Sequence, residues 1–361
     1  MNRRTRRTLW IVAAVIAVLA AAIFLRSKAP PEAARLLPES DGIIYVNLKP
    51  ARTFFHQDLK APQRVPDYQQ FIDATGIDWE KDLDEAAIAL RRMPDPNGPN
   101  GPVAYSMVLV GRITGKKLNS WLDAHAAARE SYAGHTIYSI PSEGRTVRVA
   151  QIGYDMVAVS NTPTPEQIHS IVDRHSTAAW PFAGSMLLRQ YYHEVPLLSL
   201  AWGVGQIGLP FSDSCGDEKG EQGQRDGAGQ FGLPVPKSCS ISILGLSLPL
   251  KADSTIVATV APGLLGSLHL RVEEETPSED AAVSQAASLN GMFLLARSFA
   301  EPLASSAANN GLKELLKTAE VTQKRSRVVV TAHLSPSLFS ELAGGEGFSQ
   351  ETPSGKSASN R

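Results

Sequence analysis

The sequence predicts an α+β protein: an N-terminal transmembrane helix followed by two modules, each an antiparallel sheet with helices packed on one face. Three observations predict this class. An uncharged apolar run lies near the N-terminus, segments with strand-like patterns follow one another across short turns, and each half contains a long helical segment between strands. We place the modules at residues 36–178 and 185–343.

The apolar run is residues 9–25, LWIVAAVIAVLAAAIFL, without charge, proline or glycine. A helix of this length rises roughly 25 Å, just enough for the apolar core of a bilayer. Four arginines precede the run, whereas only Arg26 and Lys28 follow it, so the positive-inside rule keeps residues 1–8 in the cytoplasm. We therefore expect a single-pass protein of the bacterial inner (cytoplasmic) membrane, with residues 26–35 as a spacer and the C-terminal body extracytoplasmic.

A basic start and a short apolar stretch also describe a secretory signal peptide, and residues 20–22 would supply small residues for its cleavage. Cleavage there would leave Ile23, Phe24 and Leu25 at the new N-terminus, so we favour an uncleaved anchor. Both alternatives place the body on the same side of the membrane.

The charge balance limits the partners of the body. Of the 35 Lys and Arg residues in the chain, six lie in residues 1–28, which contain no acid. The remaining 29 bases face 36 acids, a net charge of −7. An acidic body argues against nucleic acid as a partner and against electrostatic adhesion to anionic lipid.

The two cysteines, Cys215 and Cys239, bracket a segment rich in glycine, glutamine and charge. In an oxidising compartment such a pair predicts a disulfide, which would contribute roughly 3 kcal/mol by loop closure. Two free thiols are the alternative. A metal site is disfavoured because no histidine lies within metal-motif spacing of either cysteine.

Local patterns give the elements of the first module. We expect a strand at 42–48, short helices at 54–60 and 68–75, a helix or strand at 78–90, a buried strand at 103–113, a helix at 116–129, antiparallel strands at 138–140, 146–152 and 156–160, and a helix at 165–175. Residues 92–102 contain four prolines and form a loop.

The second module follows the same plan. We expect strands at 197–202, 240–248, 255–260 and 267–273, a long helix at 277–298, a short helix at 312–318, a hairpin of 321–323 with 327–334, and a helical turn at 338–342. The long helices of both modules open with Thr-Pro, at Thr164–Pro165 and Thr276–Pro277, which predicts threonine N-caps. Residues 344–361 have too little apolar surface to fold and form a disordered tail.

A glycine motif and an acidic segment were the first candidates for chemistry. Residues 203–208 match G-x-G-x-x-G, but Leu209–Pro210 follows instead of the helix that a dinucleotide site needs, so we interpret them as a bend. Asp78, Glu80, Asp82 and Asp84 alternate like a calcium loop. Leu83 and Ala89 stand where that loop requires glycine and a carboxylate, so we assign the acids to a solvated helix start.

The histidines and serines do not form a catalytic pattern. His125 and His175 fall at the ends of apolar helix stripes, His169 and Asp173 form a surface pair, and His193-Glu194 lacks the second histidine of a zinc protease. No nucleophile elbow, Ser-x-x-Lys pair or P-loop occurs in the body. We expect no enzymatic activity, catalytic residue, cofactor or metal, although a hydrolase with an unfamiliar site stays open because catalytic groups converge in space.

Three stretches carry a resemblance to a known family: LLPESDGIIYVNLKPAR, FIDATGIDWEKDLDEAAIAL, and the segment from LNSWLDAH to SIVDRH. In this order they resemble an uncharacterised family of bacterial membrane-anchored cell-envelope proteins with duplicated α+β modules. The resemblance covers about residues 36–175. It implies topology and location, and it brings no catalytic residues.

Two functions follow as hypotheses. The first is a non-enzymatic module that binds an envelope protein or wall component, or acts as a scaffold. The second is a periplasmic module that binds a hydrophobic ligand such as lipid, because residues 240–250 and 261–270 are rich in leucine and isoleucine. Core strands explain the same pattern.

Overall fold

The computed structural model describes residues 29–54, 66–95, 98–142, 144–177, 183–206, 214–215, 238–243, 246–251, 254–263, 267–300 and 307–335. The predicted anchor, the cytoplasmic N-terminus, the tail and most of the segment between the cysteines lie outside these residues. Among the helices that are described, none is both long and apolar enough to cross a membrane.

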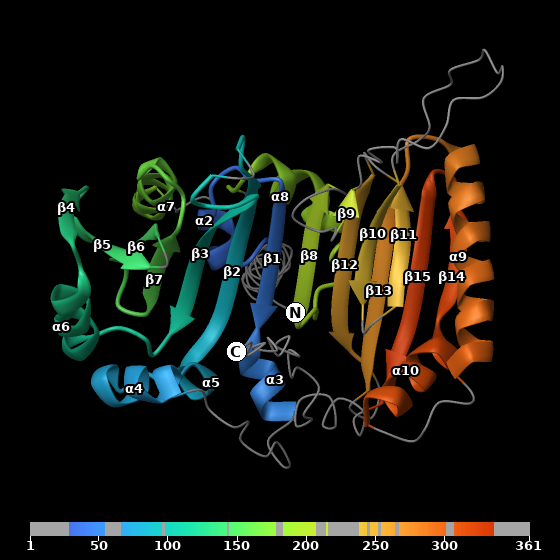
Figure 1. The fold of residues 1–361 in the computed structure, drawn as a ribbon, viewed down its shortest axis with the longest axis horizontal. Helices are drawn as coiled ribbons and strands as arrows, with labels where there is room; N and C mark the ends of the chain where they lie inside the picture. Colours follow the sequence, from blue (N-terminus) through green and yellow to red (C-terminus); the bar gives the residue numbers. More distant parts are fainter. Residues whose placement is uncertain are drawn as a thin grey trace, which may run out of the picture.

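A single antiparallel sheet of 12 strands organises the body, in the order β14-β15-β13-β12-β8-β1-β2-β3-β7-β6-β5-β4 (Figure 1). The strands are Gly42–Asn47 (β1), Leu83–Arg92 (β2), Val103–Gly111 (β3), Ala128–Tyr132 (β4), His135–Ser142 (β5), Arg145–Gln151 (β6), Met156–Ser160 (β7), Ala201–Gln206 (β8), Thr255–Pro262 (β12), Leu268–Glu275 (β13), Glu320–Lys324 (β14) and Arg327–Leu334 (β15). A second, three-stranded sheet contains Ser214–Cys215 (β9), Ser238–Ile243 (β10) and Leu246–Lys251 (β11). The α+β class is confirmed.

The two sheets expected from the sequence are one sheet, because the first strands of the two halves pair with each other. β1 and β8 are antiparallel, with Gly42 opposite Gly205 and Val46 opposite Ala201. Apolar side chains line this seam, and Tyr45 and Trp202 stack with ring centroids 5.4 Å apart. Pairing satisfies the backbone groups that each strand would otherwise leave unpaired at an apolar edge.

The expected repeat is visible as two corresponding strand orders on either side of this seam. Outward from it the first half runs β1, β2, β3, β7 and the second runs β8, β12, β13, β15. In each half, helices follow the third of these strands in the chain, and a later strand returns to pair with it. The first half adds β6, β5 and β4 beyond β7, whereas the second adds only β14 beyond β15.

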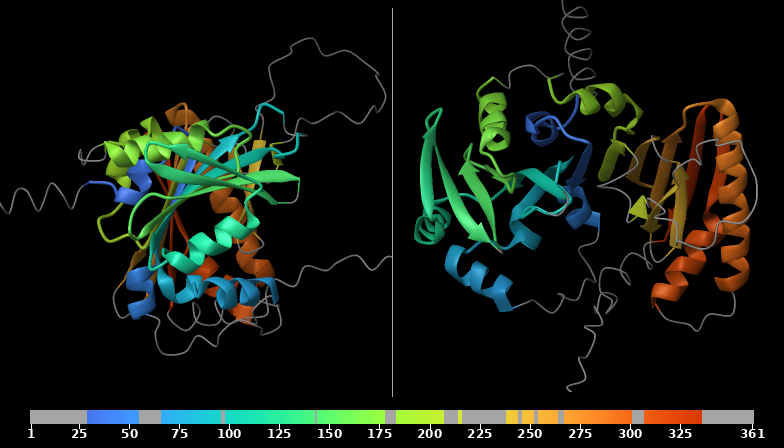
Figure 2. Two further views of the ribbon diagram at one scale, coloured as in Figure 1. Left: turned by 90° about the vertical axis from the view of Figure 1, so that its left-hand side faces the viewer. Right: turned by 45° about the horizontal axis from the view of Figure 1, so that its top comes forward.

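Helices cover both faces of the sheet (Figure 2). They are Glu32–Leu36 (α2), Leu48–Phe54 (α3), Pro66–Thr75 (α4), Trp79–Asp82 (α5), Lys116–His125 (α6), Glu166–Ser176 (α7), Met186–Tyr191 (α8), Glu279–Ala300 (α9) and Ala307–Thr318 (α10), with a 3₁₀ turn at Tyr192–Glu194 (η1). We call the face under α2, α7 and α8 the α7 face, and the opposite face, under α4, α6, α9 and α10, the α9 face.

The main core lies on the α7 face. Ala33, Ala34 and Leu36 of α2 are at most 1% exposed and belong to the same cluster as Ile168 of α7 and Leu188 of α8. The inward side chains of β1, β2 and β8 complete this cluster. A helix of five residues is therefore built fully into the core at the point where the described chain begins.

Two smaller cores lie on the α9 face, one at each end of the sheet. Side chains directly opposite each other in an antiparallel ladder share a face. The cross-strand row that connects the two cores is Leu109, Ala86, Val46, Ala201, Val260, Leu270 and Ala332. Between the cores, in the middle of this face, Ile44, Ile88, Leu90 and Val260 are only half-buried.

Most expected elements are present, with several corrections. The single strand expected at 240–248 is two paired strands, β10 and β11. Most of the helix expected at 54–60 and the helical turn expected at 338–342 lie outside the described residues. The helix expected over 116–129 ends at His125, because residues 128–132 form β4 and pair with β5. The strand expected at 197–202 is β8, at 201–206. Pro165 rather than Thr164 occupies the N-cap of α7, and the Ser278 hydroxyl, not Thr276, accepts the capping hydrogen bond from Ala281 at 3.1 Å.

Gly111 at the end of β3 provides a test of this packing. A Cβ atom there would meet the Asp82 carbonyl oxygen at 2.0 Å, and because that oxygen belongs to the backbone, no side-chain rotation relieves the contact. We expect Gly111→Ala to lower the free energy of unfolding by about 2–3 kcal/mol, measured by urea denaturation of the full chain in detergent.

Gly291 in α9 is the matched control, because no atom lies within 4 Å of the Cβ position there. Gly291→Ala should raise the free energy of unfolding by about 0.5–1 kcal/mol, since glycine is a poor helix former. Equal effects of the two substitutions would contradict this description of the β2–β3 junction.

Candidate functional site

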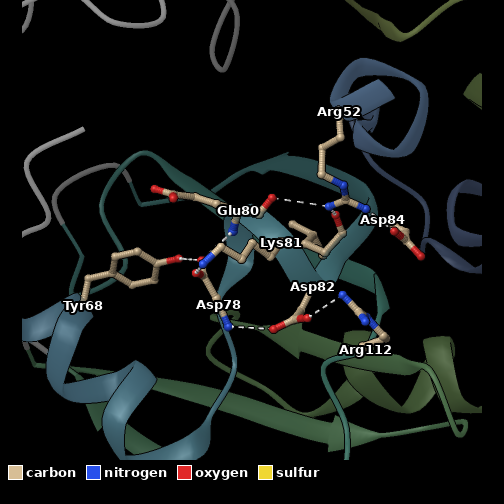
Figure 3. Close-up of polar contacts among 9 residues, drawn as sticks. Arg52, Tyr68, Asp78, Glu80, Lys81, Asp82, Asp84 and Arg112 are labelled. Carbon is tan, nitrogen blue, oxygen red and sulfur yellow. Dashed lines mark hydrogen bonds and ion pairs between the residues drawn. The ribbon is translucent and has the colours of Figure 1, made fainter. Parts of the chain in front are cut away.

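The acidic segment that resembles a calcium loop is bonded to the elements around it (Figure 3). Asp78 is buried and caps α5, accepting a hydrogen bond from the Glu80 backbone N–H at 3.2 Å. The Tyr68 hydroxyl on α4 donates to the same carboxylate at 3.2 Å, and the Lys81 ammonium lies 3.2 Å from its other oxygen. Burial and the Asp78 charge raise the pKa of Tyr68. Asp78 therefore ties α4 to α5.

The neighbouring carboxylates also have partners. Asp82 accepts the backbone N–H of Asp78 at 3.0 Å and lies 3.1 Å from the Arg112 guanidinium. Asp84 forms an ion pair with Arg52 of α3. These bonds hold α3, α5, β2 and the end of β3 together, so the segment is a structural junction. The expected solvated helix start is wrong for Asp78, which is buried because it caps α5 and bonds to α4. Across the residues that the structure describes, no three His, Cys, Asp or Glu side chains gather in a way that could hold a metal.

The sequence-predicted histidines are separated from one another. His125 stacks on Trp121 with ring centroids 4.3 Å apart, and its Nδ1 is 2.8 Å from the Trp121 carbonyl oxygen. His175 faces His135 of β5 with centroids 6.3 Å apart. The first arrangement is a helix-end contact, as the position of His125 on its stripe predicts, and the second packs α7 against the β5 end of the sheet.

His169 and Asp173 contact β4 instead of each other. The His169 ring stacks on Tyr132 at 3.8 Å, and its Nε2 lies 3.0 Å from the Glu130 carboxylate. The Tyr132 hydroxyl donates to Asp173 at 2.8 Å. These side chains hold the edge strand β4 against α7. The sequence spacing of His169 and Asp173 predicts only a contact within their own helix, so it could not show this.

A charged cleft of about 520 Å³ lies where β13, β15 and the β14–β15 turn meet. Its lining residues are Arg271, Glu273, Glu275, Lys324, Arg325, Ser326, Arg327 and Val329. Within it Arg271 pairs with Glu273 at 2.8 Å, and Arg327 pairs with Glu194 of η1 at 2.7 Å. The lining residues are up to 58 positions apart in the chain, and the Glu194–Arg327 ion pair joins residues 133 positions apart, so no local motif predicts this site.

A buried polar pair lies on the α7 face beside the β1–β8 seam. Burial raises the pKa of Glu85, and burial together with the Glu85 charge raises the pKa of its hydrogen-bond partner, Tyr45. Tyr192 packs against Trp202 next to this pair, with centroids 5.5 Å apart. The charges of Asp84 and Glu32 add smaller contributions that also raise the pKa of Glu85. The hydrogen bond between Tyr45 and Glu85 gives this carboxyl a partner inside the packed seam.

Two further histidines are brought together across strands. His269 of β13 lies directly opposite His333 of β15, and their ring centroids are 4.2 Å apart. Burial lowers the pKa of His269, with smaller contributions from His333 and Arg271. They are 64 positions apart, and only the strand register reveals the pair.

The glycine motif and the cysteines lie on strands. Residues 203–206 belong to β8, with Gly203 and Gly205 opposite Ile44 and Gly42, so the bend expected there is wrong for these four residues. Residues 207 and 208 lie outside the described residues. Cys215 of β9 and Cys239 of β10 are directly opposite in an antiparallel ladder. Directly opposite residues have Cα atoms about 4.5–5.5 Å apart, within the range that a disulfide requires. The disulfide stays a prediction.

The fold defines the class of the protein, which is α+β with a 12-stranded antiparallel sheet. The acidic and histidine side chains considered as site residues contact neighbouring helices and strands. No protein-family model and no curated protein matches the sequence. Among solved structures, crystal form I of TP0453 is similar at 11% identity and a TM-score of 0.42, over 88% of this chain and 98% of that one. Crystal form III of TP0453 gives 9% and 0.42, over 87% and 98%. Likeness at this level does not carry a function from one protein to another.

The junction at Asp78 can be tested by substitution. Asp78→Ala removes an N-cap and leaves the Tyr68 hydroxyl without its acceptor, so we expect the free energy of unfolding to fall by about 2–3 kcal/mol in urea denaturation. Asp123→Ala is the control, because Asp123 pairs with Arg129 at 3.0 Å where both side chains are about half exposed. It should cost less than about 1 kcal/mol. A calcium-dependent rise in the melting temperature of the unmodified chain would oppose the structural role.

Proposed function

We propose that the chain is a membrane-anchored, extracytoplasmic module of a bacterial cell envelope that binds a partner protein or wall component, or acts as a scaffold, without enzymatic activity of its own. The observation that carries the proposal is the position of α2. Its first residue, Glu32, follows the end of the apolar run at Leu25 by seven positions. Ala33 and Ala34 are already fully buried in the main core.

The short connection supports a function at the membrane surface. Residues 26–31 can span at most about 20 Å when fully extended. A body held by an anchor in the inner membrane would therefore stay within one small-domain diameter of the bilayer. Binding a partner at that surface requires the body to stay close to the bilayer, and a connection of this length would keep it there.

The absence of enzymatic activity is the part of the proposal that rests on the polar clusters. Asp78, Asp82, Glu194 and His169 each bond to side chains or backbone groups of neighbouring elements. A catalytic group needs a face open to substrate and a pKa suited to proton transfer. These four side chains hold elements together instead.

The location can be tested in intact cells. In spheroplasts of a host expressing the full chain, we expect external protease to digest residues after the anchor, and a cytosolic marker to survive. Blocking free thiols before and after reduction should show one disulfide, because the same compartment is oxidising. A protected body with two free thiols would contradict the proposed side of the membrane.

Partner binding is tested separately by capturing the tagged full chain from detergent-solubilised membranes after brief chemical cross-linking. An unrelated single-pass protein with the same tag is the control. Recovery of one envelope component with this chain alone supports the proposal. Recovery of none above the control would overturn the binding role, whatever the location experiment shows.

A second function, hydrophobic-ligand binding, is favoured by one observation. Ile44, Ile88 and Leu90 lie in the middle of the α9 face, between the core under α6 and the core under α9 and α10, and they are only half-buried. An acyl chain lying on this row would bury apolar area at about 25 cal/mol per Å². Native mass spectrometry of the full chain released from detergent should show bound lipid if this function is correct, and a mass equal to the chain alone if it is not.

A further inference from the structure

His269 and His333 face each other at the closest position that an antiparallel ladder allows. The Thr276 N–H donates to the Ser326 carbonyl at 2.9 Å, which makes that pair a hydrogen-bonded one. Hydrogen-bonded and non-hydrogen-bonded pairs alternate along the ladder, so His269 and His333, seven steps further, form a non-hydrogen-bonded pair. Side chains of such pairs are the closest in a sheet, with Cα atoms about 4.5 Å apart.

We propose that His269 and His333 together bind a divalent copper ion. Imidazole nitrogens are common ligands for copper, which binds N and O donors more tightly than the other first-row divalent ions. The two side chains come from neighbouring strands of one sheet, so their Cβ atoms are held at a fixed separation, and rotation about the side-chain torsions turns a nitrogen of each ring toward a shared point.

The ring separation is compatible with a shared metal ion. With a metal–nitrogen bond of about 2.0 Å, two imidazole centroids lie about 4.5 Å apart for a right angle at the metal and about 5.2 Å apart for a tetrahedral angle. The observed rings are in edge-to-face contact at 4.2 Å, so a small rotation of the side chains reaches either separation. Copper is favoured over zinc because it binds nitrogen and oxygen donors more tightly.

The surroundings support a preformed pair. Thr318 at the end of α10 holds the backbone of His333: its hydroxyl donates to the His333 carbonyl at 2.9 Å and accepts the His333 N–H at 3.1 Å. The nearby positive charge of Arg271 is offset by its ion pair with Glu273 at 2.8 Å. As no third protein ligand gathers here within the described part of the chain, water would complete the coordination.

The other histidine pair offers an internal comparison. His135 and His175 have centroids 6.3 Å apart, too far for a right angle at one metal ion. The Nδ1 of His135 is also engaged with the Gln151 carbonyl oxygen at 3.0 Å. Removing His135 therefore changes the histidine content of the chain without touching the proposed site.

The test is titration of the full chain in detergent, isolated without reductant, with copper(II) chloride. Binding is followed by electron paramagnetic resonance and by the change in melting temperature. We expect one tight copper(II) ion with two equatorial nitrogen ligands in the unmodified chain. His269→Gln and His333→Gln should each weaken binding by about 100-fold, because a chelate loses its second, intramolecular contact. His135→Gln should bind as the unmodified chain does.

Each remaining outcome overturns the proposal. These are no copper binding by the unmodified chain, binding that His269→Gln and His333→Gln leave intact, or equal loss in His135→Gln. Circular dichroism of each variant confirms its fold, and the two site variants test the same claim independently if one of them fails to fold. Zinc chloride provides the comparison of metals: zinc binding as tight as copper binding would contradict the assignment to copper.

Discussion

The pairing of β1 with β8 is the constraint on which the rest of the body depends. Each strand begins one half of the repeat, and each would leave a row of backbone donors and acceptors open if its half stood alone. The seam also buries Tyr45 and Trp202, both 3% exposed, and full burial of a large apolar side chain contributes about 1.5–3 kcal/mol. Joining the halves thus turns two open sheets into one and gives α8 a continuous surface to cover.

Because β1 and β8 pair in the centre, the free edges of the sheet are β4 and β14 at its two ends. Charged side chains protect both edges. β4 carries Arg129 and Glu130 on an exposed strand, and β14 carries Glu320 and Lys324. Charged side chains on an edge strand oppose pairing with another chain. The same residues that could suggest binding patches in the sequence therefore have a simpler role in keeping a long sheet from extending into another molecule.

The sequence predicted local structure well and long-range pairing poorly, for physical reasons. Alternation of apolar and polar side chains located β15, a continuous apolar run located β3, and flanking turn residues located β1. Alternation does not state which strand lies alongside, so the β1–β8 seam and the single sheet could not be inferred. The helix prediction runs into the first two residues of β4 because Ala126, Ala127 and Ala128 favour helix locally, whereas pairing with β5 decides the structure.

Sequence patterns likewise identify polar residues that are neighbours in the chain and miss those that only strand pairing brings together. The acidic segment from Asp78 to Asp84 was visible because its members are adjacent, yet adjacent carboxylates in this fold find separate partners in α3, α4 and β3. The His269–His333 pair is close in space because of the strand register, and the Glu194–Arg327 ion pair joins the turn η1 to β15. In both cases the spacing in the chain is arbitrary. In a sheet built from two halves joined at one seam, the groups positioned most firmly relative to each other are cross-strand pairs. Candidate binding residues in such a fold are therefore best looked for among cross-strand pairs, because backbone hydrogen bonds fix their relative positions. Motifs of residues that are close in the sequence are a poorer guide.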